Sequence, residues 1–127
     1  MSEATLEHIN LTVADVSATA QVLIDLFDWH IRWQGDAIHG GHSIHVGGES
    51  SYLALYSRGE LKERQADTYN ELFGLNHIAV VVDDIHATEQ KVLAAGFKTY
   101  SHASYEPGQR FYFDDSYGLE IEVVSYR

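Results

Sequence analysis

The stretch "LEHINLTVADV", residues 6–16, decides the fold because the chain repeats it as "LNHIAVVVDDI" at residues 75–85. The two histidines, His8 and His77, stand 77 − 8 = 69 positions apart. The likeness runs without a gap for about twenty positions, and a fixed offset over that length is typical of an internal duplication. We therefore expect this chain to contain two copies of one structural module.

Each copy begins with an expected strand. Alternate residues of a strand share a face, so His8 and Asn10 lie on one face and Ile9 on the other. In the second copy, His77 and Ile78 likewise lie on different faces. An aspartate that can cap a helix follows each strand. The helical stripe after Asp15 contains Val16, Ala20, Leu23 and Phe27, and the stripe after Asp84 contains Ile85, Thr88, Val92 and Gly96.

Three further strands complete each copy, separated by turns with glycine or polar residues. Their expected ranges are 30–38, 42–48 and 50–57 in the first copy, and 97–104, 109–115 and 119–126 in the second. The sequence therefore predicts an α+β fold of two tandem βαβββ modules, at about residues 1–58 and 74–127, joined by a connector at 59–73.

Composition narrows the functional classes. The 127 residues contain no cysteine, which excludes disulfides, zinc–thiolate sites and cysteine nucleophiles, and we expect a single cytoplasmic domain. Neither a membrane span nor a signal peptide is recognisable. The net charge of −11 disfavours nucleic acid and anionic lipid as partners.

The last expected strand supplies carboxylates. Glu120 and Glu122 alternate with apolar residues, so both lie on the face opposite the apolar row. Two histidines at equivalent positions and one carboxylate from a third strand are the ingredients of a two-histidine, one-carboxylate site for a divalent metal ion. Such a site leaves coordination positions open for a substrate.

The motifs "LEHI", "LNHI" and the closing "FDDSYGLEIEVV" (residues 113–124), within paired βαβββ modules, resemble the vicinal oxygen chelate superfamily. This superfamily includes glyoxalase I, extradiol dioxygenases, methylmalonyl-CoA epimerase, fosfomycin-resistance transferases and metal-free bleomycin-resistance proteins. The resemblance implies curled mixed sheets around a shared cavity, and pairing of chains as a homodimer. Ser116 and Tyr117 depart from the family's usual turn.

The resemblance also implies the ligand set. The family's carboxylate is the fourth residue after the turn glycine, Gly118, which selects Glu122 to join His8 and His77 around one Fe, Mn, Ni or Zn ion. Where glyoxalase I has a fourth ligand, this chain offers Ala54, or Tyr52 on the same face. The resemblance therefore favours an open three-ligand site.

The same resemblance assigns further roles. Tyr112, ten residues before Glu122, and His102 are the candidate catalytic acid–base residues, and Tyr52, Asn10 and Arg110 are the candidate substrate-binding residues. The implied function is a metal-dependent, dioxygenase-like or lyase-like enzyme for a small molecule with adjacent oxygens. A metal-free binder of the bleomycin-resistance type and a thiol transferase of the fosfomycin-resistance type are the alternatives, although fosfomycin itself is disfavoured because the family's phosphonate-binding residues are replaced.

Other residues have structural interpretations. The histidines at 39, 42 and 45 cross a glycine turn, which favours a solvated hairpin over a second metal site. Trp29, Trp33 and Phe111 are aromatic-pocket candidates that are more typical of cores or interfaces. Glu120 is expected to be a polar neighbour of the site.

Overall fold

The computed structural model describes residues 3–63, 67–105 and 108–127. The chain forms two compact units, Met1–Lys62 and Glu63–Arg127, each built from contiguous sequence. Part of the predicted connector, residues 59–62, belongs to the first unit, and residues 63–73 belong to the second. Within the described residues, no helix is long and apolar enough to cross a membrane.

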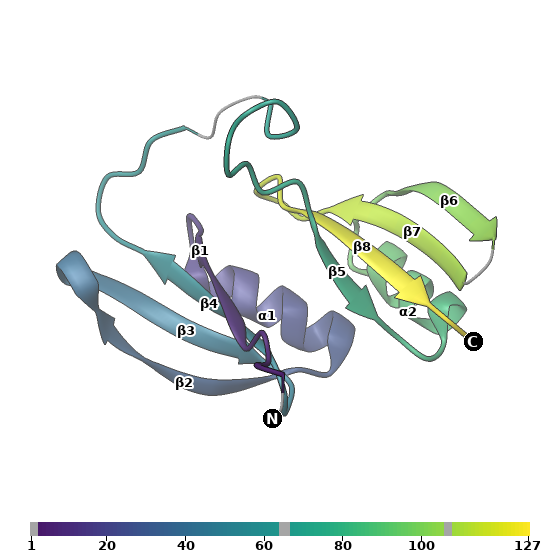
Figure 1. The fold of residues 1–127 in the computed structure, drawn as a ribbon, viewed down its shortest axis with the longest axis horizontal. Helices are drawn as coiled ribbons and strands as arrows, with labels where there is room; N and C mark the ends of the chain where they lie inside the picture. The colour runs from purple at the N-terminus through teal and green to yellow at the C-terminus, as the bar shows by residue number, and fades with distance from the viewer. Residues whose placement is uncertain (1–2, 64–66, 106–107) are drawn as a thin grey trace. The chain divides into compact units, whose positions relative to one another are not determined.

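The first unit is one βαβββ module. Its elements are β1 (His8–Thr12), α1 (Val16–Phe27), β2 (His30–Ala37), the short 3-10 helix η1 (Ile38–Gly40), β3 (Gly41–Gly47) and β4 (Tyr52–Ser57). The sheet order is β1-β4-β3-β2, with β1 parallel to β4 and the other pairs antiparallel. Helix α1 lies across one face of this sheet (Figure 1).

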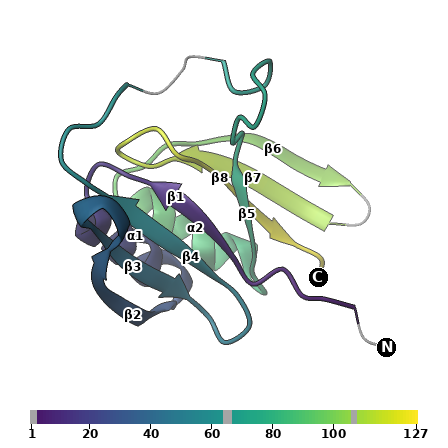
Figure 2. The ribbon, with the colours of Figure 1, turned by 60° about the vertical axis from the view of Figure 1, so that its left-hand side comes forward.

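The second unit repeats the arrangement. Its elements are β5 (Ile78–Val81), α2 (Ile85–Ala94), β6 (Thr99–Tyr105), β7 (Gly108–Asp114) and β8 (Glu120–Ser125). The sheet order β5-β8-β7-β6, again with a parallel first pair, matches that of the first unit. Figure 2 shows α2 on one face of this sheet. The predicted α+β class and the predicted repeat are therefore confirmed.

Each helix begins at the predicted aspartate. Asp15 Oδ1 accepts a hydrogen bond from the Ala18 backbone N–H at 3.0 Å, and Asp84 Oδ1 accepts one from Ala87 at 3.0 Å. Two residues of the predicted stripes are placed differently. Leu26 rather than Phe27 is buried in α1, and Gly96 lies beyond the end of α2, where its φ of +95° ends the helix.

The apolar core of each unit lies between its helix and its sheet. Leu23 of α1 and Leu55 of β4 are at most 1 % exposed in the first unit. Val92, Phe111 and Phe113 fill the same space in the second unit, and each is at most 1 % exposed. The helix of each unit therefore covers the apolar face of its sheet, and the polar residues lie on the other face.

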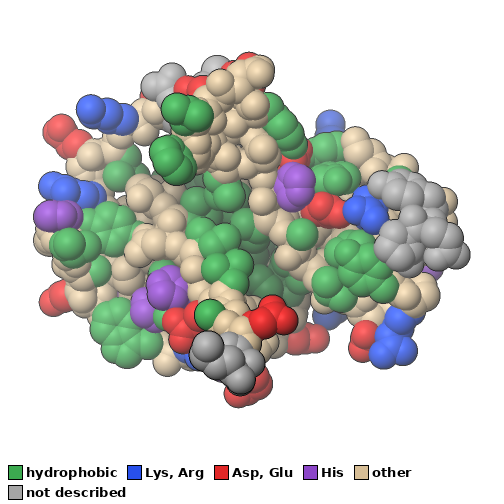
Figure 3. Space-filling model, viewed as in Figure 1, with side chains coloured by type: hydrophobic (Ala, Val, Ile, Leu, Met, Phe, Trp, Pro, Cys, Tyr) green, Lys and Arg blue, Asp and Glu red, His purple; other side chains and the backbone are tan. Residues whose placement is uncertain are grey.

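The surface mixes polar and apolar groups. Acidic, histidine and hydrophobic side chains are interspersed on the face shown in Figure 3. In the connector, Leu72 and Phe73 are 93 % and 104 % exposed. These two side chains therefore contribute nothing to either core.

Candidate metal and substrate site

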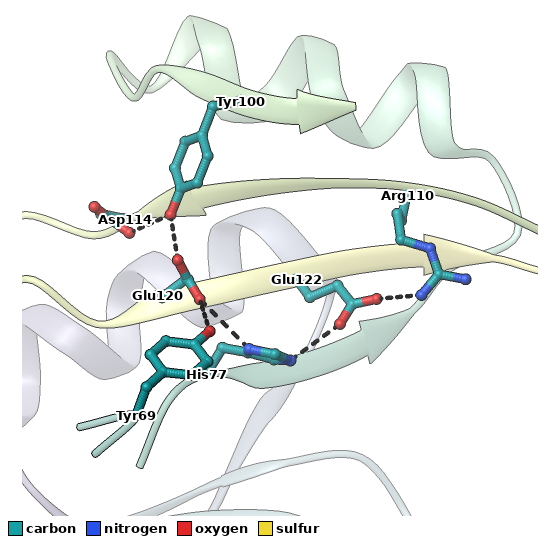
Figure 4. A network of polar contacts seen from close by, with 7 residues as sticks. All are labelled: Tyr69, His77, Tyr100, Arg110, Asp114, Glu120 and Glu122. Atoms are coloured by element: carbon teal, nitrogen blue, oxygen red, sulfur yellow. Dashed lines mark hydrogen bonds and ion pairs between the residues drawn. The ribbon is translucent and has the colours of Figure 1, made fainter. Parts of the chain in front are cut away.

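The polar face of the second sheet brings His77, Glu122 and Arg110 together (Figure 4). His77 immediately precedes β5, Glu122 lies in β8, and Arg110 lies in β7. His77 Nε2 is 3.1 Å from Glu122 Oε1, and Arg110 Nη1 donates to Glu122 Oε2 at 2.9 Å. The Glu122 side chain is only 9 % exposed, so both of its oxygens face cationic or hydrogen-bonding nitrogens in a largely dry environment.

Tyr112 belongs to the same group. It stands opposite Glu122 in the β7–β8 register, and its ring meets the His77 ring edge to face at 5.6 Å between centroids. Period-two alternation therefore places Tyr112, Glu122 and Arg110 on one face, while Phe111 points into the core. Phe111 is thereby removed from the aromatic-pocket candidates.

Glu120 is the centre of a second polar cluster beside His77 (Figure 4). Tyr100 Oη is 2.7 Å from Glu120 Oε2 and 2.8 Å from Asp114 Oδ1, and Tyr69 donates to Glu120 Oε1 at 3.4 Å. Burial, followed by the hydrogen bonds to Glu120 and Asp114, raises the pKa of the Tyr100 phenol. Tyr100 therefore remains a hydrogen-bond donor at neutral pH.

His102 lies on the opposite face of the sheet, and this separates it from the other predicted site residues. Its Nε2 is 2.7 Å from Glu89 Oε2 on α2, and its ring stacks on the buried ring of Phe111 at 5.9 Å. The cause is a bulge between Tyr100 and Ala103, where Ser101 has a φ of +55° and reverses the alternation of the strand. We therefore do not retain His102 as an acid–base residue.

In the first unit, His8 is held against Tyr52. The two rings stack at 4.8 Å, His8 Nδ1 is 2.9 Å from Glu7 Oε1, and Tyr52 donates to the same oxygen at 3.3 Å. The hydrogen bond from His8, partly opposed by desolvation, lowers the pKa of Glu7. Burial and then the Glu7 charge raise the pKa of Tyr52. A charged carboxylate and a neutral phenol thus flank His8.

The strand registers relate the two modules residue by residue. Asn10, Ala54 and His45 stand side by side across β1, β4 and β3. The corresponding row in the second module is Ala79, Glu122 and Tyr112. Ala54 therefore occupies the place of Glu122, so the first module contributes no carboxylate at this position.

The remaining histidines and tryptophans take up separate positions. The His45 ring stacks with that of Tyr52 at 4.8 Å and is tilted against that of Trp33 at 5.0 Å, whereas His39 lies in η1 with a φ of +60°. Burial lowers the pKa of His45, which favours a neutral ring.

In the described part of the chain, no three His, Asp or Glu side chains form a cluster that could hold a metal ion.

A divalent ion suits the donors present in the second unit. An imidazole nitrogen and a carboxylate oxygen are ligands that Fe, Mn, Ni and Zn accept. Here they converge to 3.1 Å, with the imidazole 30 % exposed and the carboxylate 9 % exposed. His77 Nδ1, although 3.4 Å from Glu120 Oε1, is buried without hydrogen-bond geometry to any described residue. Nε2 and Glu122 Oε1 are thus the two atoms of this pair that a divalent ion could share.

Known structures share this fold. A glyoxylase/bleomycin resistance protein/dioxygenase domain from Frankia sp. EAN1pec is 18% identical, with a TM-score of 0.81, and the match covers 99% of this chain and 100% of that chain. The fosfomycin resistance protein FosX from Listeria monocytogenes, complexed with Mn(II) and sulfate, is 19% identical, with a TM-score of 0.72 and coverage of 98% and 93%.

A comparison of the sequence with family models assigns the chain to a family. No curated protein sequence matches the chain. One family model, described as "Glyoxalase/Bleomycin resistance protein/Dioxygenase superfamily", matches residues 5–123. This match spans both βαβββ modules. The chain therefore belongs to the glyoxalase, bleomycin resistance protein and dioxygenase superfamily, as its duplicated histidine strands indicate.

Proposed function

We propose that this protein is a divalent-metal-dependent enzyme that acts on a small molecule with two adjacent oxygens. The proposed ligands are His8, His77 and Glu122. The observation that carries the proposal is the convergence of His77 Nε2 and Glu122 Oε1 to 3.1 Å beside Tyr112. Membership of the superfamily supports it, as does the Mn(II) bound by the structurally similar FosX.

The proposed ion, Fe, Mn, Ni or Zn, would act as a Lewis acid toward the substrate oxygens. Tyr112 is the proposed acid–base residue because its half-buried phenol stands opposite Glu122 on the same face. Arg110 holds one oxygen of Glu122, which leaves the other oxygen for His77 and the ion. Tyr52 and Asn10 are the proposed substrate contacts of the first module.

A metal-free binding protein is the second candidate. The observation that favours it is the satisfaction of Glu122, because His77 and Arg110 already occupy both of its oxygens. A buried carboxylate with two such partners is stable without an added cation. Under this proposal the same polar face binds a small ligand but performs no chemistry on it.

Metal binding distinguishes the two candidates. Protein purified without a histidine tag is stripped of metal, incubated with Fe(II), Mn(II), Ni(II) or Zn(II), and its bound metal is measured by mass spectrometry. The enzyme proposal expects about one ion per chain in the wild type, and loss of that ion in His8→Ala, His77→Ala and Glu122→Ala. His102→Ala is the matched control and should retain the ion, because His102 lies on the helix side of its sheet.

Each outcome assigns the function. A wild-type protein that binds none of the four ions overturns the enzyme proposal in favour of the metal-free binder. Retention of metal in His8→Ala with loss in His77→Ala would restrict the site to the second module.

We also propose that the protein is a homodimer, which light scattering of the eluted protein tests directly.

A further inference from the structure

In both modules a carboxylate faces the Nδ1 atom of the repeated histidine. His8 Nδ1 is 2.9 Å from Glu7 Oε1, and His77 Nδ1 is 3.4 Å from Glu120 Oε1. A tyrosine holds the carboxylate in each case. Tyr52 donates to Glu7 at 3.3 Å, and Tyr100 donates to Glu120 at 2.7 Å. A tyrosine, a carboxylate and a histidine are therefore in contact in both modules, through a hydrogen-bond distance at His8 and through a longer ion-pair distance, without hydrogen-bond geometry, at His77.

The tyrosine–carboxylate–histidine contacts of the two modules use residues at different positions of the repeat. His8 stands opposite Tyr52 in the β1–β4 register, whereas His77 and Glu120 each directly precede the first β5–β8 pair, Ile78 and Ile121. The module-two counterpart of Glu7, 69 positions further on, is Asn76. Its Oδ1 atom is buried without a hydrogen-bond partner among the described residues. A simple copy of the first module would have a carboxylate at position 76. The carboxylate near Nδ1 is instead the preceding residue, Glu7, in the first module and a residue of another strand, Glu120, in the second.

A carboxylate at Nδ1 has a definite effect on an imidazole. Where it accepts a hydrogen bond from Nδ1, as Glu7 can at 2.9 Å, it favours the tautomer with the proton on Nδ1 and fixes the rotation of the ring, which leaves the Nε2 lone pair available. At 3.4 Å from His77 Nδ1, and without hydrogen-bond geometry, the charge of Glu120 favours the same tautomer. In the second module, Nε2 points at Glu122, the proposed companion ligand. Figure 4 shows Glu120 on one side of the His77 ring and Glu122 on the other.

We propose that Glu7 and Glu120 are positioning residues that fix His8 and His77 with Nε2 as the metal-binding atom. This inference rests on the proposed function, because it concerns the two histidines of the proposed site. Tyr52 and Tyr100 act one step further out by fixing the two carboxylates. Neither glutamate touches the substrate or the ion.

The test uses Glu120→Gln and Glu7→Gln, which keep the size of each side chain and remove its charge. Two quantities are measured on metal-stripped protein: the Kd for Mn(II) by calorimetry, and the imidazole nitrogen shifts in proton–nitrogen correlation spectra at about pH 8, where an ordinary histidine is neutral. Glu120→Gln should raise the Kd about 10- to 100-fold and should change the nitrogen shifts of His77 while those of His8 remain. Glu7→Gln should also raise the Kd, and it should change the nitrogen shifts of His8 while those of His77 remain.

Glu89→Gln is the matched control, because Glu89 pairs with His102 at 2.7 Å on the helix side of the sheet. It should change the shifts of His102, and it should leave the shifts of His8 and His77 and the Kd unchanged. Unchanged His77 and His8 shifts, or an unchanged Kd in both test variants, overturn the positioning role while wild-type metal binding stands. A wild-type protein that binds no ion overturns the proposed function instead, and that failure is visible before any variant is made.

Discussion

Removing the positive charge of Arg110 tests the buried part of the site. In Arg110→Met, Glu122 Oε2 loses the nitrogen that donates to it at 2.9 Å. The two side chains are only 18 % and 9 % exposed, so water reaches the abandoned carboxylate poorly. The sequence predicts Arg110 to be a substrate ligand, whereas the structure gives its guanidinium a partner within the protein.

The expected loss of stability follows from this geometry. Removing one partner of a fully buried ion pair costs about 3–5 kcal/mol. His77 still faces the other oxygen, and Arg110 is not completely buried, so the lower end applies and the free energy of unfolding should fall by about 3 kcal/mol. For a chain of 127 residues, roughly 4 °C per kcal/mol gives a fall in Tm of roughly 12 °C.

The assay is urea unfolding followed by far-ultraviolet circular dichroism. Arg127→Met is the matched control, since it breaks a 3.0 Å ion pair with Asp83 in which the side chains are 75 % and 84 % exposed. Its effect should stay below about 1 kcal/mol. The double variant Arg110→Met with Glu122→Gln should recover part of the loss, because no charge is then left buried. Equal effects of the two arginine variants, or no recovery in the double variant, would refute this reasoning.

Three further predictions concern the framework. Asp84→Ala removes the hydrogen bond that begins α2 and should lower the free energy of unfolding by about 1 kcal/mol in urea titrations. Gly47→Ala should lower Tm sharply because its Cβ would overlap the backbone leading into β4, whereas Gly48→Ala, with open space around it, should change Tm little; calorimetry compares the two. Partial burial opposes ionisation of Glu89, but hydrogen bonds from a threonine and a histidine hold its pKa below the ordinary 4.5. The ionised Glu89 side chain therefore contributes its full stabilisation above about pH 4.5, and this stabilisation is lost as pH falls through the folded-state pKa. Glu89→Gln should consequently flatten the decline in urea midpoint between about pH 5 and pH 3.

The fold was predictable because its signals are local. Alternation in the strands, an aspartate before each helix and the repeat of 69 positions specify both modules without any knowledge of tertiary contacts. The same alternation predicts that Glu120 and Glu122 lie opposite the apolar row of the last strand, and Ile121 and Val123 of that row are fully buried. Errors are confined to element ends, as at Gly96, where the backbone conformation rather than hydrophobicity ends the helix.

The site was less predictable because it depends on irregular backbone and on side-chain partners. The bulge at Ser101 moves His102 to the helix side, and neither glycine nor proline marks it in the sequence. Glu7 and Tyr100 have no pattern of their own, since each matters only through the side chain it contacts. Counting the acceptors around each histidine would have indicated Glu7, its immediate neighbour in the chain.

The contiguity of the two units has a consequence for how the protein is made. Each strand pairing among the described residues lies within one unit, so β4 emerges from the ribosome with β1 already available as its partner. The end of β8, Ser125, follows the end of β4, Ser57, by 125 − 57 = 68 residues. At about 5–20 residues per second this is a delay of roughly 3–14 seconds. The strands of the first module can therefore pair with one another before the last strand of the second module is synthesised.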